Sequence, residues 1–81
     1  MKAKCVVIEQ NAILQVPVMC PTDAGVSHSE LAGGKKVISA GFCRIDGSQV
    51  QAYGESIGLK IPSRGTPDAE LIAKFYCGVG V

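Results

Sequence analysis

The sequence contains no long hydrophobic run and no large excess of either charge, and both absences narrow the possible classes of function. No apolar stretch approaches the roughly 20 residues of a membrane-spanning helix. The start, Met-Lys-Ala-Lys-Cys, lacks the continuous apolar run of a signal peptide. The net charge is only +1, without the basic surplus that favours nucleic acid or membrane surfaces. We therefore expect a cytoplasmic protein that binds neither membranes nor nucleic acids.

Closely spaced cysteines are absent as well. No two of the four cysteines, Cys5, Cys20, Cys43 and Cys77, stand within the about two to four residues that separate paired ligands in zinc knuckles or redox motifs. We expect free thiols that act as small buried hydrophobic residues, with no bound metal and no cofactor. A metal site that used Cys20 and His28 would need further ligands, and the sequence offers no obvious ones.

What the chain does contain is a large share of apolar residues for its size. Hydrophobic residues make up 47% of 81 residues, although aromatic residues contribute only 5%. A chain of this length forms one domain, residues 1–81, and buries only about 60% of the surface of its unfolded form. Surplus apolar surface on a small domain often marks an interface. We therefore expect a homo-oligomer, most simply a twofold dimer.

The N-terminal third predicts a β-hairpin. Residues 2–8 alternate and then become β-branched, residues 9–12 have the composition of a turn, and residues 13–19 return as a second strand. Pro17 cannot donate a hydrogen bond to a neighbouring strand, which indicates an edge strand or a bulge. Apolar side chains occur on both faces of this hairpin. A helix over one face and a partner molecule over the other would account for them.

Asp46-Gly47, between two alternating runs, predicts a second hairpin over residues 37–57. If these two residues form the loop, Cys43 pairs with Val50. The two faces then carry Ile45, Cys43, Gly41, Val50 and Ala52 on one side, and Arg44, Phe42, Gln49, Gln51 and Tyr53 on the other. A three-residue loop that includes Ser48 remains an alternative, and it would pair Phe42 with Ala52.

Two helices are predicted, one between the hairpins and one after them. Ser27 and Glu30 have the spacing of a capping box, and Gly33-Gly34 ends this short helix. The last helix begins with Thr66 as N-cap, Pro67 at the first helical position and Asp68 near the positive end of the helix dipole, and it ends at Gly78. We predict an α+β fold: an antiparallel sheet of about four strands, with the C-terminal helix across one face.

One constellation has the chemistry of an anion site. Ser63, Arg64 and Thr66 lie at the start of the last helix, with Lys60 nearby in sequence. Free N–H groups, hydroxyls and a guanidinium are the usual partners of an anion. The alternative for the same residues is a capped helix with a solvated arginine.

His28 is the only histidine, and adjacent serines and Glu30 do not by themselves supply catalytic geometry. We expect an exposed histidine in the first turn of a short helix. A pairing of His28 with a cysteine such as Cys20 is the enzymatic alternative.

Three segments resemble a pattern in small, uncharacterised bacterial accessory proteins of the kind carried on gene cassettes. They are Ser39-Ala-Gly-Phe, Tyr53-Gly-Glu-Ser-Ile-Gly-Leu, and Ser63-Arg64 followed by Asp68-Ala-Glu-Leu-Ile72. The resemblance covers roughly residues 37 to 75. It implies a bacterial source and an accessory role, and it assigns no activity and no catalytic residue.

The sequence therefore favours a non-enzymatic interaction protein that associates with itself or with another protein. A small-anion or small-ligand binding domain that uses Ser63, Arg64, Thr66 and Lys60 is the second hypothesis. An enzyme that works through a cysteine or His28 is the third.

Overall fold

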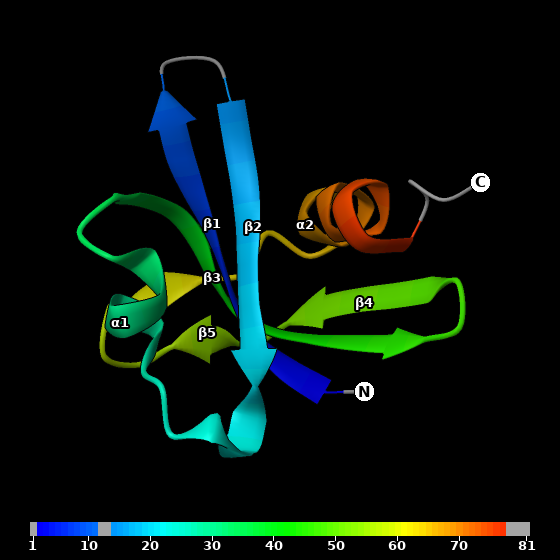
Figure 1. Cartoon of the computed structure of the whole chain (residues 1–81), viewed down its shortest axis with the longest axis horizontal. Coiled ribbons are helices and arrows are strands. Elements are labelled where there is room, and N and C mark those ends of the chain that lie inside the picture. Colours follow the sequence, from blue (N-terminus) through cyan, green and yellow to red (C-terminus); the bar gives the residue numbers. More distant parts are fainter. Residues whose placement is uncertain (1, 12–13, 78–81) are drawn as a thin grey trace.

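The structure, a computed structural model, describes residues 2–11 and 14–77. Its elements follow in the order β1 (Lys2–Asn11), β2 (Leu14–Pro21), a 3₁₀ turn η1 (Thr22–Ala24), α1 (His28–Ala32), β3 (Lys36–Asp46), β4 (Gln49–Tyr53), β5 (Glu55–Ser56), β6 (Ile61–Pro62), α2 (Thr66–Ile72) and a π-helical turn η2 (Ala73–Cys77). The main sheet is antiparallel and has the order β2-β1-β3-β4 (Figure 1). The predicted α+β fold is confirmed. Among the described residues, no helix has the length and apolar character needed to cross a membrane.

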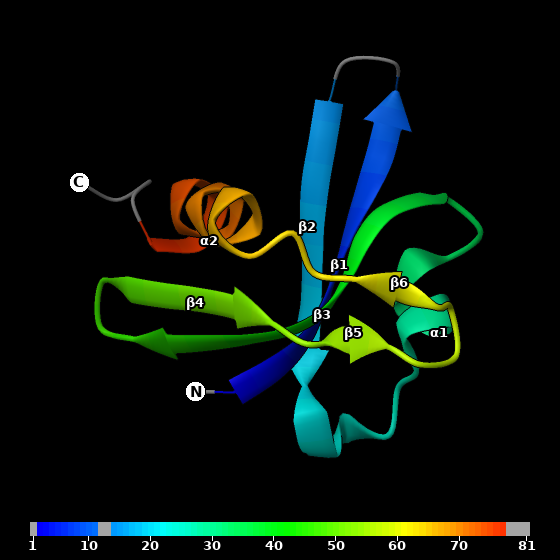
Figure 2. The ribbon, with the colours of Figure 1, turned by 180° about the vertical axis from the view of Figure 1, so that it is seen from behind.

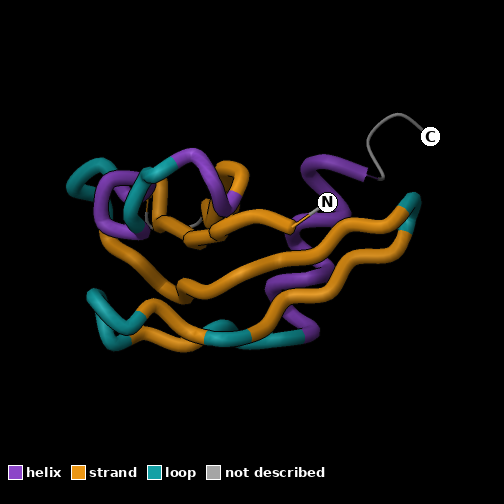
Figure 3. Tube along the Cα trace, turned by 90° about the horizontal axis from the view of Figure 1, so that it is seen from below, coloured by secondary structure: helices purple, strands orange, loops and turns teal. Residues whose placement is uncertain are grey.

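The sheet is covered on both faces by the chain itself. Val6 and Ile8 of β1 pack with Ala32 of α1. Two further residues pack against this cluster: Leu59, which precedes β6, and Ile61, the first residue of β6. The two helical regions are separated from each other along the strands (Figure 3) and lie on opposite sides of β1 and β2 (Figure 1). The β5–β6 hairpin lies beside α1 (Figure 2). The apolar residues on both faces of the first hairpin therefore do not require a partner molecule to cover them.

The second face of β1 is closed by α2. Ala3 and Cys5 of β1, Cys43 of β3 and Ile72 of α2 form one buried cluster. Tyr76 of η2 also reaches β2, where its hydroxyl donates to the carbonyl oxygen of Pro17 at 2.8 Å. The C-terminal helix is thus held on the sheet at two places, as the prediction of a helix across one face requires.

The first hairpin differs from its prediction at the turn. β1 continues through Glu9 to Asn11, because Glu9 pairs with Gln15 of β2 and Lys36 of β3, so these residues are strand rather than turn. Ala12 and Ile13, which were predicted as the end of the turn and the start of the second strand, lie outside the described residues. β2 is an edge strand, and the edge position inferred from Pro17 is confirmed.

The second hairpin has a register that neither predicted loop gives. Asp46 pairs with Gln49 and Cys43 with Ala52, so Gly47 and Ser48 are the central turn residues. Gly47 has a φ of 61° and Ser48 does not have a positive φ, which is the pattern of a type II′ turn. The shift from the two-residue prediction is two positions. Because side chains alternate with a period of two, every residue keeps its predicted face.

The predicted start of α1 is confirmed, whereas the predicted start of α2 is wrong. The capping box of α1 is confirmed, since the Glu30 N–H donates to Ser27 Oγ at 3.1 Å and the Ser27 N–H donates to Glu30 Oε1 at 3.0 Å. The prediction of Thr66 as N-cap is wrong: Gly65 occupies that position without a side-chain cap, and Thr66 is the first helical residue. Gly78, the predicted end of the last helix, lies outside the described residues.

Candidate functional site

Asp68 is the buried centre of the segment that leads into α2. Its side chain is 3% exposed, and one of its oxygens accepts from Arg64 Nε at 2.7 Å. The other accepts from the Arg64 N–H at 2.8 Å and from Ser63 Oγ at 3.4 Å. Asp68 therefore joins α2 to Ser63 and Arg64, the two residues before its N-cap, without capping the helix itself.

The residues of the predicted anion site are only partly brought together. Ser63 and Arg64 are adjacent, but the guanidinium already faces the Asp68 carboxylate, and its NH2 group donates to Gln15 Oε1 at 3.2 Å. Arg64 is thus a paired residue and not a solvated one. Lys60 belongs to the 57–60 turn, which lies beside α1 in Figure 2, away from the start of α2. An anion site at these residues stays a prediction, and the arrangement gives it no free cation from Arg64.

His28 has a structural role in this arrangement. Its Nε2 lies 2.7 Å from the carbonyl oxygen of Gly41, and its ring meets that of Phe42 edge-on at a centroid distance of 5.4 Å. The side chain is half-buried rather than exposed as predicted, because these contacts hold α1 against β3. Among residues 2–11 and 14–77, no group of at least three His, Cys, Asp or Glu side chains could hold a metal ion.

The cysteines behave largely as predicted. Cys5 and Cys43 are buried, Cys20 is half-buried, and all three are free thiols. A hydrogen bond with Cys43, together with burial, raises the pKa of the Cys5 thiol far above its ordinary value. The side chain of Cys77 lies outside the described part of the structure. The hydrogen bond between the two thiols lowers the pKa of Cys43, which is fully buried. The raised pKa and the burial of Cys5 do not suit the reactive nucleophile that a cysteine-dependent enzyme needs.

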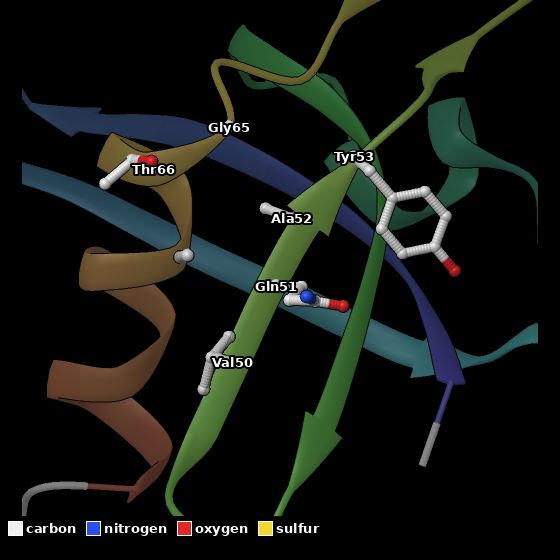
Figure 4. Close-up of a pocket in the computed structure, with 7 residues that line it drawn as sticks. Val50, Gln51, Ala52, Tyr53, Gly65 and Thr66 are labelled. Atoms are coloured by element: carbon white, nitrogen blue, oxygen red, sulfur yellow. The ribbon is translucent and has the colours of Figure 1, made fainter.

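A groove of about 400 Å³ lies between β4 and the start of α2. Figure 4 shows it with β3 on the far side of β4, so the groove borders the edge of the sheet that has no neighbouring strand among the described residues. Seven residues line it, four from β4 and three from the helix side: Val50, Gln51, Ala52, Tyr53, Gly65, Thr66 and Ala69. None of them carries a charge at neutral pH. The groove is therefore suited to bind an extended strand through its backbone.

The two edges of the main sheet differ in the residues that they present, although α2 lies alongside β4 across the groove (Figure 4). β2 contains Pro17 and Pro21, which cannot donate to an added strand. β4 contains neither proline nor a charged residue, the two common devices that stop edge-to-edge pairing. Sequence analysis missed this difference because the edge position of β4 depends on the strand order. The uncharged, proline-free run from Ser48 to Gly54 is the signal that could have indicated it.

Comparison of the chain with protein-family models, with curated proteins and with solved structures finds no match. The resemblance to gene-cassette accessory proteins therefore stays a prediction.

Proposed function

We propose that this protein is a non-enzymatic interaction protein that forms a twofold dimer through the free edge of β4. The observation that carries the proposal is the contrast between the proline-containing edge at β2 and the uncharged, proline-free edge at β4. An edge strand offers a row of backbone N–H and C=O groups to another strand, and a second copy of β4 is complementary to it.

The groove supports the same role. Its lining includes Gly65, Ala52 and Ala69, and these small residues leave room beside β4 for another backbone. Tyr53, at the end of the strand, is 43% exposed and offers an aromatic contact of the type enriched in interfaces. The seven described residues of the lining include no histidine, cysteine, carboxylate, lysine or arginine, the groups that usually carry acid–base or nucleophilic chemistry.

A bacterial cytoplasm is the compartment that we propose for this dimer. The described cysteines, Cys5, Cys20 and Cys43, are free thiols, which suits a reducing environment. An accessory role that works through binding is consistent with a site built from backbone groups and small side chains.

Gln51 is the central residue of β4, so a twofold axis near it places Gln51 opposite its own copy. The parent protein is expected to sediment as a dimer at micromolar concentration. Gln51→Lys and Gln51→Glu should each sediment as monomers, because like charges directly opposite each other destabilise strand pairing. A mixture of the two variants should restore the dimer, since the opposed charges then attract.

Leu14→Lys is the matched control, because it places a charge at the other edge of the sheet, on a side chain that is 43% exposed. This variant should remain dimeric. A parent protein that is monomeric at every concentration, or a Gln51→Lys variant that remains dimeric, would refute the proposal. Loss of the dimer in Leu14→Lys alone would move the interface to β2.

A further inference from the structure

Three sulfur atoms converge on one face of the sheet, one from each of three adjacent strands. Cys5 of β1 is directly opposite Met19 of β2. On its other side Cys5 is opposite Gly41 of β3, so Cys43 is its diagonal neighbour on the same face. The Cys43 thiol donates to Met19 Sδ at 3.2 Å. These contacts bring together residues that are up to 38 positions apart in the chain (5 to 43).

The surroundings keep the two thiols away from water, and Met19 is partly buried against them. Ala3 lies opposite Cys43 on β1, and its short side chain lets Met19 reach across the strand. Ile72 of α2 packs in the same cluster. Cys5 is 5% exposed and Cys43 is fully buried. A soft ion held there would be shielded from solvent and from competing oxygen ligands.

Ser39 adds an unexplained polar atom beside this cluster. Its Oγ is buried and has no hydrogen-bond partner among the described residues. Ser39 and Cys5 line the same small internal cavity, which has no room for a water molecule. An unpartnered buried hydroxyl destabilises a folded protein, because it has lost its hydrogen bonds to water. If Cys5 were a thiolate and not a thiol, its negatively charged sulfur could accept a hydrogen bond from the Ser39 hydroxyl.

We propose that Cys5, Cys43 and Met19 bind one Cu(I) ion. Thiolate and thioether sulfurs are soft ligands that select Cu(I), whereas a structural Zn²⁺ site needs four ligands in a tetrahedron. For three metal–sulfur bonds of about 2.3 Å in one plane, the sulfurs are roughly 4 Å apart. Cys43 and Met19 at 3.2 Å therefore need only a small side-chain movement to open the site.

Binding requires no electron transfer and no further reactant. The ion enters as Cu⁺, each thiol that forms a copper–thiolate bond releases its proton to water, and the Met19 thioether binds through a lone pair without losing an atom. Loss of a single proton leaves the site uncharged, which the apolar surroundings favour over a net negative charge.

The test is an anaerobic competition in which the intact protein takes Cu(I) from its bicinchoninate complex. We expect one Cu(I) per chain and an X-ray absorption spectrum that contains sulfur neighbours only. Met19→Leu conserves core volume and should lower the affinity roughly tenfold or more, because one of three soft ligands is lost. Ser39→Ala should lower it by about 10-fold, because the hydroxyl supports the bound sulfur.

Cys20→Ala is the control, since Cys20 follows Met19 in β2 and points to the opposite face. Its affinity for Cu(I) should equal that of the parent. Circular dichroism would establish that Met19→Leu, Ser39→Ala and Cys20→Ala are folded. Absence of Cu(I) binding in the parent, nitrogen or oxygen ligands in the spectrum, or unchanged affinity in folded Met19→Leu would overturn the proposal. Loss of binding in Cys20→Ala would also do so.

Discussion

Arg64→Ala is expected to lower the free energy of unfolding by about 2–3 kcal/mol, although an isolated surface arginine contributes little. The reason is its partner, since the Asp68 side chain is 3% exposed and loses its only ion pair in the described residues. A buried carboxylate without its cation costs more than the lost attraction itself. The backbone N–H of residue 64 and Ser63 Oγ still donate to Asp68 in this variant. The loss of stability is therefore smaller than for a buried carboxylate with no hydrogen-bond donor. Urea denaturation at neutral pH measures the change.

Arg44→Ala is the matched control for this prediction. Arg44 forms an ion pair with Asp46 at 2.9 Å, but the two side chains are 53% and 59% exposed. We expect a change within about 0.5 kcal/mol, as for other exposed pairs. The double variant Arg64→Ala/Asp68→Ala should be more stable than the sum of the single variants predicts, because no unpaired charge then remains buried. Equal effects of Arg64→Ala and Arg44→Ala would contradict the buried-pair interpretation.

Gly41→Ala is expected to destabilise the protein by about 2–3 kcal/mol through overpacking. A Cβ at Gly41 would lie 2.5 Å from the carbonyl oxygen of Tyr53 and 3.2 Å from two backbone atoms of Gly54. Backbone cannot move aside as a side chain does, so the end of β4 must separate from β3. The loss corresponds to a fall in the melting temperature of roughly 10 °C or more for a domain of this size. Thermal unfolding followed by circular dichroism measures it.

Gly58→Ala provides the comparison for this substitution. A Cβ at Gly58 meets no atom within 4 Å, and its φ is not in the left-handed region. The melting temperature should be unchanged or slightly raised, because alanine reduces the freedom of the unfolded chain. A Gly41→Ala variant as stable as Gly58→Ala would show that β3 and β4 do not approach as closely as the structure has them.

Local patterns predicted much of the fold because their physical causes are local. Ser27 and Glu30 interact within one helical turn, so their spacing predicts the capping box. The faces of the second hairpin followed from alternation alone. Its register did not, because Asp46-Gly47 and Gly47-Ser48 are both compatible with a primed turn that places glycine at a positive φ.

The parts of the site that sequence could not predict depend on strand order and on long-range contacts. Asp68 was assigned to the helix dipole, whereas its burial results from the packing of α2 on the sheet. The pairing with Arg64 at the i,i+4 spacing was visible in the sequence, but its strength depends on that burial. Met19 was not considered as a partner of the cysteines, because only the register of β1 with β2 and β3 brings their sulfurs together.

The central position of β1 has a consequence for how the molecule opens. This strand is hydrogen-bonded on both sides, and its residues from Cys5 to Ile8 are all buried. Its amide protons should therefore exchange with deuterium only when the whole chain unfolds, whereas those of β4 and of the β5–β6 hairpin exchange through local opening. Exchange followed by NMR would yield the global unfolding free energy from Val6 and Val7, and a smaller value from β4. β1 would then be the last strand to lose its structure.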